Sequence, residues 1–211
     1  MNIFQYPLGQ LQANCYLLVE DDSCILIDPA DNASFILEEI ERKRLTLQGL
    51  IATHGHFDHL MAVGEIQLSY QTRFGTDLPL FIHPKDQFLL KRLVQTAKHF
   101  LDYEPAVIPI QSTEDLKMGK QKLGDFSFEV IHTPGHTPGS CSIHFPERHT
   151  LFTGDTLFQG AIGGYDHAYS DKEELFKSVN FLLKLPPETE VYAGHGESTL
   201  IASEELILSS Y

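Results

Sequence analysis

Basic residues and long apolar runs are both scarce in this 211-residue chain. Lys and Arg total 15 against 29 Asp and Glu, so the formal net charge is −14, and we expect no nucleic-acid partner because phosphate binding needs a basic face. No run approaches the roughly 20 apolar residues that span a bilayer, so we expect no membrane span. The N-terminus MNIFQYPLGQ has no basic segment followed by an apolar core, so no secretory signal is expected either.

Cysteine is also rare, and its arrangement excludes a disulfide framework. Cys15, Cys24 and Cys141 form neither an even set nor a CxxC pair. Such usage suits a reducing compartment, and it predicts a cytoplasmic protein. All three lie in or at the start of apolar runs, which predicts small buried side chains.

The hydrophobic content, by contrast, is high enough at 42% to build a sizeable core. Short apolar runs predict strands at 14–20, 24–29, 50–54, 78–83, 140–145, 150–155 and 188–196, the first two joined by a DDS turn into a hairpin. A period-two pattern over 117–132 predicts another hairpin, which turns at Gly124-Asp125. Helical spacing predicts helices after a cap at Asp31 or Asn32, from 60 to about 70, over 85–100 after Pro84, over 171–185 after a cap at Ser170 or Asp171, and over 203–210. Residues 101–115 read as a connector. Strands that alternate with helices predict one α/β domain with mixed sheets over 1–211.

One short polar run stands out between the strand at 50–54 and the helix that follows. THGHFDH, residues 53–59, holds three of the chain's 11 histidines. His54 and His56 are two positions apart, so they project to one side of an extended segment. Asp58 and His59 follow in the turn and can face a second point. Imidazole and carboxylate ligate zinc, iron and manganese, so this run predicts the local half of a two-metal site.

One loop cannot complete two coordination shells, and three further loops after apolar runs offer ligands. They are His136 in HTPGHTPGS, Asp155 in LFTGDTLF and His195 in VYAGHGES. Each follows a glycine, which permits close backbone approach. A chance collection of polar loop residues is the alternative interpretation. Seven such residues, all at strand ends, favour a metal centre.

The remaining histidines are given other roles. His132 precedes the Pro-Gly loop and is expected to support it. His167, in GGYDHAYS, lies just after the Asp155 loop and is, with Tyr165, a candidate substrate-binding residue. The others have no companion ligand nearby and are expected to be structural or surface residues: His83, His99, His144 and His149.

The seven candidate ligands resemble the signature of the metallo-β-lactamase superfamily, HxHxDH followed by a distant His, Asp and His. The stretches LGQLQANCYLL, LIDPAD, HTPGHTPGS, FTGDTLF and AGHGESTLIASEE look like its glyoxalase II-like branch. The resemblance implies a four-layer αβ/βα sandwich, two mixed sheets packed face to face with helices outside. It also implies two divalent metal ions, zinc first, with iron or manganese accepted. By its pattern, metal 1 is held by His54, His56 and His136, metal 2 by Asp58, His59 and His195, and Asp155 bridges them.

Two departures from that branch concern glutathione. Long-form glyoxalase II enzymes carry a C-terminal helical region whose basic residues help grip glutathione, and we expect no such extension after His195 here. Many short relatives place Arg or Lys after the IG of the Asp155 loop, where this chain has Gly164. A cationic clamp for an anionic substrate is thereby lost. Lys172 or Lys177 would replace it only if the loop folds back.

The resemblance implies a hydrolase for a small-molecule thioester such as S-2-hydroxyacylglutathione. A metal-bridging hydroxide would attack the acyl carbon, with Asp58 both ligating and orienting it as the catalytic residue. One alternative is a persulfide dioxygenase with a single iron held by His54 or His56, His136 and Asp155. A lactonase is the other. True β-lactamases generally lack an aspartate equivalent to Asp155, so β-lactams are not the expected substrate.

Overall fold

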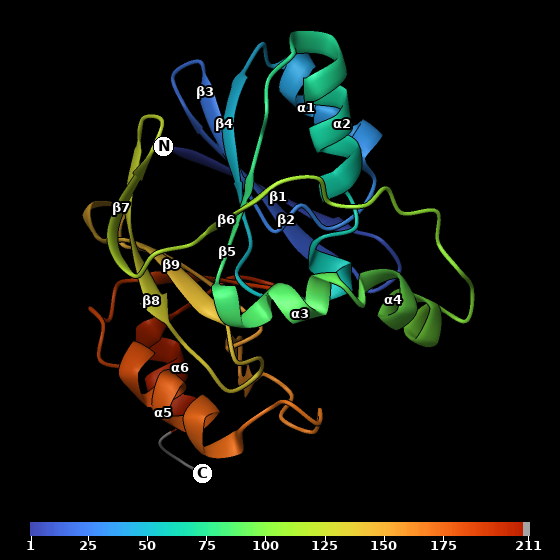
Figure 1. Ribbon diagram of the computed structural model, residues 1–211. Helices are drawn as coiled ribbons and strands as arrows, with labels where there is room; N and C mark the ends of the chain where they lie inside the picture. Colours follow the sequence, from blue (N-terminus) through green and yellow to red (C-terminus); the bar gives the residue numbers. More distant parts are fainter. Residues whose placement is uncertain (209–211) are drawn as a thin grey trace.

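The computed structural model describes residues 1–208 as two six-stranded sheets with helices on their outer faces (Figure 1). The first sheet runs in the order β1 (Asn2–Leu8), β2 (Ala13–Glu20), β3 (Ser23–Ile27), β4 (Thr46–Ile51), β5 (Leu80–Ile82) and β6 (Thr113–Asp115). Its first three strands pair antiparallel, and β3 to β6 pair parallel. It is therefore a mixed sheet, as predicted.

The second sheet is also mixed. Its order is β14 (Thr199–Leu200), β13 (Glu190–Ala193), β10 (Thr150–Gly154), β9 (Cys141–Phe145), β8 (Phe126–His132) and β7 (Gly119–Leu123). Only the pair of β10 and β13 is parallel among these neighbours. A separate two-stranded ribbon joins β11 (Leu157–Phe158) to β12 (Ala161–Ile162).

Helices cover the outer face of each sheet. α1 (Ala33–Arg42) and α2 (Val63–Phe74) pack beside the first sheet, whereas α5 (Lys172–Leu182) and α6 (Ile201–Leu208) lie against the second (Figure 1). Shorter segments, α3 (Gln87–Leu90) and α4 (Leu93–Leu101), follow β5. No helix within residues 1–208 is long and apolar enough to cross a membrane.

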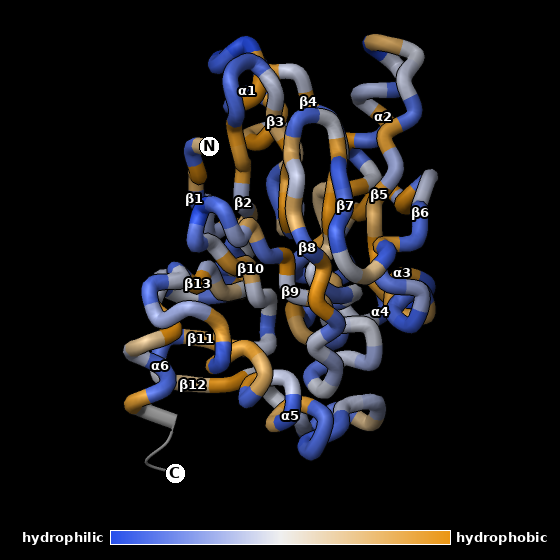
Figure 2. The backbone as a smooth tube through the Cα atoms, turned by 90° about the vertical axis from the view of Figure 1, so that its left-hand side faces the viewer, coloured by the Kyte–Doolittle hydropathy of each residue, from blue (hydrophilic) through white to orange (hydrophobic). Residues whose placement is uncertain are grey.

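Alternation along the strands divides the hydrophobic residues among three cores. In β2, Leu17 packs toward α1 and α2, while the next residue, Leu18, packs between the two sheets. In β10, Leu151 packs under α5 and α6, while Phe152 joins the central core. Each such side chain contributes about 1.5–3 kcal/mol when fully buried. The three cores define four layers, α/β/β/α, so the predicted sandwich is confirmed, and hydrophobic stretches lie along strands of both sheets (Figure 2).

Several predicted boundaries differ from the structure. The helix expected over 85–100 is broken, because Arg92 departs from helical dihedrals (φ −110°, ψ 3°) and its N–H bonds the Leu89 carbonyl as in a turn. The helix after the histidine run begins at Val63, since a 3₁₀ turn (Phe57–His59) comes first. β6 lies inside the expected connector. The strands β1, β11, β12 and β14 were not predicted, and residues 209–210 of the last expected helix lie outside the described part.

Candidate metal centre

The histidine run and the three distant loops meet at one edge of the sandwich. The run follows β4 of the first sheet, while the other three loops belong to the second sheet, after β8, β10 and β13. Backbone hydrogen bonds join the sheets there, from Cys141 N–H to Thr53 O and from Asn14 N–H to Gly194 O, both 2.8 Å. The site therefore lies across the junction of the two sheets.

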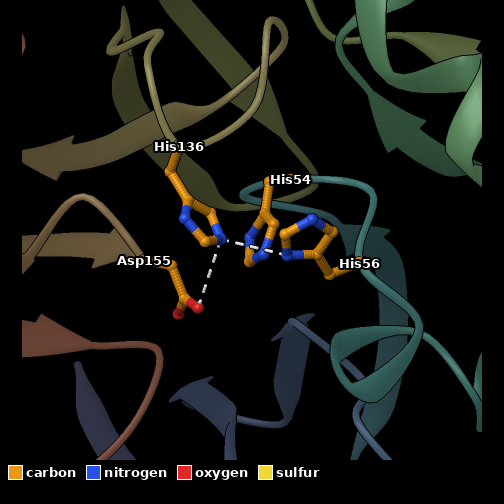
Figure 3. Close-up of side chains that lie close together, drawn as sticks. All are labelled: His54, His56, His136 and Asp155. Atoms are coloured by element: carbon orange, nitrogen blue, oxygen red, sulfur yellow. Dashed lines mark hydrogen bonds and ion pairs between the residues drawn. The ribbon is translucent and has the colours of Figure 1, made fainter. Parts of the chain in front are cut away.

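A first group of ligand atoms comes from His54, His56, His136 and Asp155, all within 4.8 Å of one another. His136 Nε2 lies 3.0 Å from His56 Nδ1 and 3.4 Å from an oxygen of Asp155. Figure 3 shows the three imidazoles and the carboxylate pointing toward one another, with His54 and His56 on one loop and His136 and Asp155 on two others. These atoms could hold one metal ion.

A second group comes from Asp58, His59 and His195. His195 Nε2 lies 3.3 Å from Asp58 Oδ2, and His59 Nε2 lies 3.8 Å from the same oxygen. Asp155 lies between the two groups, with Oδ1 3.5 Å from His59 Nε2 and Oδ2 3.4 Å from His136 Nε2. The structure thus brings all seven candidate residues together, in two sets that share one carboxylate.

The hydrogen bonds of the five imidazoles leave one nitrogen of each facing this centre. The other nitrogen is occupied in every case: His54 Nδ1 by Thr53 Oγ1, His56 Nε2 by the Tyr169 hydroxyl, His59 Nδ1 by Asp28, His136 Nδ1 by Gly164 O and His195 Nδ1 by Leu11 O. Carboxylate and carbonyl oxygens can only accept, so they fix the tautomer that turns a lone pair inward. Such partners typically orient metal-ligating histidines.

Three buried atoms at the centre have no hydrogen-bond partner in the described structure: His54 Nε2, His59 Nε2 and Asp155 Oδ1. A buried polar atom without a partner costs about 1–3 kcal/mol, and native proteins keep few of them. All three are lone-pair donors that face the same space. Divalent cations would satisfy them together, so the residues present fit the metal ions expected from the sequence.

Comparison with known proteins agrees with this geometry. The family pattern described as "Metallo-beta-lactamase superfamily" matches residues 8–195, most of the chain. The chain belongs to the metallo-β-lactamase superfamily. The site is accordingly the metal-binding site of a superfamily of metallohydrolases.

Two curated relatives are similar over nearly their whole length. "Hydroxyacylglutathione hydrolase GloC" of Haemophilus influenzae is 37% identical, with 97% of this chain and 95% of that protein covered. "Probable metallo-hydrolase YqgX" of Bacillus subtilis is 33% identical, with 94% and 92% covered.

Two solved structures also have a similar fold over nearly the whole of this chain. One is described as the BLEG-1 B3 metallo-β-lactamase (TM-score 0.86, 32% identity, 97% of this chain and 96% of that chain). The other is TTHA1623 in a di-iron-bound form (TM-score 0.85, 35% identity, 95% and 96%).

Electrostatics within the superfamily site favour a cation at the second group. Burial opposes protonation of His59, but the carboxylates of Asp58, Asp155 and Asp28 outweigh it and raise the pKa of His59 to about 10. Burial alone would raise the pKa of Asp58, yet His59 and His195 hold it below its usual range. The same field that favours a proton on His59 would favour a metal cation more strongly, because its charge is higher.

The first group is less attractive to protons. Burial, and then the neighbouring His59 ring, keep the pKa of His54 well below its usual range. Burial and His136 act in the same direction on the pKa of His56. Both rings are therefore neutral, the form in which imidazole binds a metal.

Two buried carboxylates, which the sequence interpretation gave no role, hold the ligand loops. Asp28 accepts from the Thr53 N–H (2.7 Å), the Thr53 hydroxyl (2.6 Å) and His59 Nδ1 (3.0 Å). The only sequence signal for it is its place at the end of a strand, in LIDPAD.

Asp86 is the second of these carboxylates, and it joins two ligand loops. It accepts from the Gly55 N–H (2.9 Å), the Thr137 hydroxyl (2.6 Å) and the Gly139 N–H (2.7 Å). Burial raises the pKa of Asp86 despite these bonds. Gly55 lies between two ligands of the first group and Thr137 follows the third, so one side chain fixes both loops.

Glycines before the distant ligands permit the close approach that the sequence predicts. A Cβ at Gly194 would overlap Asp155 Oδ1, and a Cβ at Gly154, whose φ is +51°, would overlap the Thr53 hydroxyl. Larger residues at these two positions would push the bridging carboxylate or the first ligand loop out of place.

The two candidate substrate-binding residues occupy different environments. The ring of His167 lies 5.3 Å from that of His56 and 5.9 Å from that of His136, at the edge of the first group. Tyr165 is exposed and faces Phe176, with Lys172 Nζ 5.2 Å from its ring centroid. Lys172 is thus close to the loop that lacks a cation at Gly164, whereas Lys177 pairs with Glu174.

The other histidines lie away from the seven ligands. His132 Nε2 donates to the Pro138 carbonyl (3.0 Å), so this side chain supports the Pro-Gly loop as expected, and its ring stacks on His83. His144 is buried, His149 faces Glu188, and His99 packs on Phe100.

Proposed function

We propose that the protein hydrolyses a small-molecule thioester, with S-2-hydroxyacylglutathione as the first candidate. The observation that carries the proposal is Asp155, whose two oxygens face two separate groups of ligands. The 37% identical relative named hydroxyacylglutathione hydrolase supports the choice of substrate. Two divalent cations, zinc first, are the proposed cofactors, and the proposed location is the cytoplasm.

When bound, the two cations supply an activated water at neutral pH and stabilise negative charge that develops on the acyl oxygen. Asp58 contributes a carboxylate that stays ionised, because His59 and His195 hold its pKa low against the effect of burial. It can therefore accept a hydrogen bond from the attacking water and fix its orientation. A thiolate is a good leaving group, so no strong general acid is required.

The cysteines support a mechanism without a covalent nucleophile. All three are free and buried. Burial raises the pKa of both Cys15 and Cys24 to about 12, so neither is a thiolate at neutral pH. Water is therefore the proposed nucleophile.

The decisive experiment combines metal analysis with turnover of S-lactoylglutathione by the purified protein. We expect about two metal ions per chain together with thioester hydrolysis. Asp155→Ala should abolish turnover and reduce the metal content, since it removes the ligand shared by both groups. Full turnover by Asp155→Ala would contradict the proposed mechanism.

A second candidate is a persulfide dioxygenase with one iron. The first group favours this reaction, because its histidines and its one aspartate could hold a single iron without any ligand from the second group. Oxygen uptake with glutathione persulfide, one iron per chain and no thioester turnover would select it. A lactone and a β-lactam belong in the same assay, the latter because one similar structure is described as a B3 metallo-β-lactamase.

A further inference from the structure

The loop 163–170 is bonded directly to two histidines of the first group. His136 Nδ1 donates to the Gly164 carbonyl (2.8 Å), and the Ser170 hydroxyl donates to the His136 carbonyl (2.7 Å). Farther along, the Tyr169 hydroxyl lies 2.8 Å from His56 Nε2. The loop that carries the candidate substrate-binding residues therefore also supports the metal ligands.

The contact with Tyr169 bears on which nitrogen of His56 faces the centre. His56 Nδ1 is the inward atom, since it lies 3.0 Å from His136 Nε2. A cation on Nδ1 requires the proton to sit on Nε2, where it must find an acceptor inside a largely buried site. The Tyr169 oxygen is the acceptor that the described structure provides.

Ring contacts hold Tyr169 in place for this bond. Its ring stacks on His167 at 5.4 Å with an interplanar angle of 16°, and Phe88 meets it edge-on at 5.6 Å. These contacts involve the ring and not the hydroxyl. Removal of the oxygen alone would leave the packing intact and would leave the Nε2–H without an acceptor.

We propose that Tyr169 is a positioning residue that sets the tautomer and orientation of His56, so that metal affinity at the first group depends on the loop 163–170. Tyr169 is not part of the ligand signature, and it lies 113 positions from His56 in the sequence. The role does not depend on which substrate the enzyme hydrolyses. The loop 163–170, which carries the candidate substrate-binding residues, is thus hydrogen-bonded to the ligands of the first group.

The test compares Tyr169→Phe with Tyr165→Phe, two tyrosines of the same loop. Metal-free proteins are titrated with Co²⁺ and Zn²⁺ against a chromophoric chelator, and the Co²⁺ absorption bands are recorded. We expect Tyr169→Phe to weaken one of the two binding steps about 10–100-fold and to shift the Co²⁺ bands of that step. Tyr165→Phe should bind metal as the unaltered protein does, because its contacts are with Phe176 and Lys172.

A second measurement assigns the affected step. In a His195→Ala background the second group is incomplete, so the remaining tight step reports the first group, and Tyr169→Phe should weaken it by the same factor. Unchanged affinity for both metals in Tyr169→Phe would overturn the proposal. So would an equal loss in both steps accompanied by a lower melting temperature of the metal-free protein, because that pattern marks general damage to the fold. Neither readout involves turnover, so a failed thioester assay would leave this test unaffected.

Discussion

At the scale of single residues, the metal centre depends on side chains that do not face it but form hydrogen bonds with its ligands. Asp28 is buried and ties Thr53 to His59, and Thr53 in turn accepts from His54. One carboxylate thus orients a ligand from each of the two groups. Asp28 does not face the metal centre, because its oxygens accept from the Thr53 N–H and from His59 Nδ1. Loss of its carboxylate should nevertheless reduce metal retention, because the ligands that it orients would be free to turn.

Asp28→Asn tests this arrangement. An amide keeps one acceptor oxygen but turns a donor toward groups that are themselves donors, so the metal-free protein should lose about 1–3 kcal/mol of unfolding free energy. We also expect fewer metal ions retained after dialysis. Urea unfolding and metal analysis provide the measurements, with the exposed Asp22→Asn as the matched control. Equal stability and metal content in the two variants would show that Asp28 has no such role.

The seven ligand candidates could be named from the sequence because four lie within one short run and the rest follow glycines at strand ends. Asp28, Asp86 and Tyr169 could not be named in the same way. Each acts through a tertiary contact, at separations of 25, 31 and 113 positions along the chain. No local spacing encodes such a pairing.

At the scale of elements, α5 begins next to a ligand loop. Asp171 caps it by accepting from the Glu174 N–H (3.0 Å), and its own N–H donates to the Gly135 carbonyl (2.8 Å), beside His136. The cap side chain serves the helix, whereas the backbone bond serves the loop. The two functions can therefore be separated by mutation.

Asp171→Ala should reduce the unfolding free energy by about 1 kcal/mol, the usual contribution of an N-cap, while metal content stays unchanged. Asp171→Asn should retain the stability, because Asn caps as well as Asp does. Chemical denaturation of the three proteins measures the difference. If Asn proves as destabilising as Ala, the negative charge and not the cap matters.

Helices and strands differ in how far the sequence predicts them. The β2–β3 hairpin follows from two short apolar runs joined by a polar turn, the β7–β8 hairpin follows from a period-two pattern, and both are confirmed. The break between α3 and α4 does not follow, because Leu89, Leu93 and Ala97 keep the spacing of one continuous buried helix face. β1 contains Pro7 and is only half-buried at the sheet edge, so its pattern is weak.

At the scale of the whole molecule, the metal centre connects the two sheets. Four ligands come from the first sheet's loop after β4, and three come from loops of the second sheet. Cations bound there would link the layers in addition to the central core. The folded state alone offers this complete set of ligands.

Chelator treatment should therefore lower the melting temperature, and zinc should restore it. A ligand that binds only the folded state stabilises it by about 2.7 kcal/mol when its free concentration is 100 times its Kd. Thermal denaturation with and without EDTA, with metal content measured in each sample, provides the test. An unchanged melting temperature in fully metal-depleted protein would show that bound metal does not stabilise the packing of the two sheets.

The distribution of ligands along the chain has a consequence for biosynthesis. The first group is complete in sequence once Asp155 has been made, whereas the second must wait for His195, which follows it in the chain. A nascent chain leaving the ribosome can thus assemble one cation position while the other still lacks a donor. Loading of the pair would then be ordered in time, with the second ion admitted only after His195 has been synthesised.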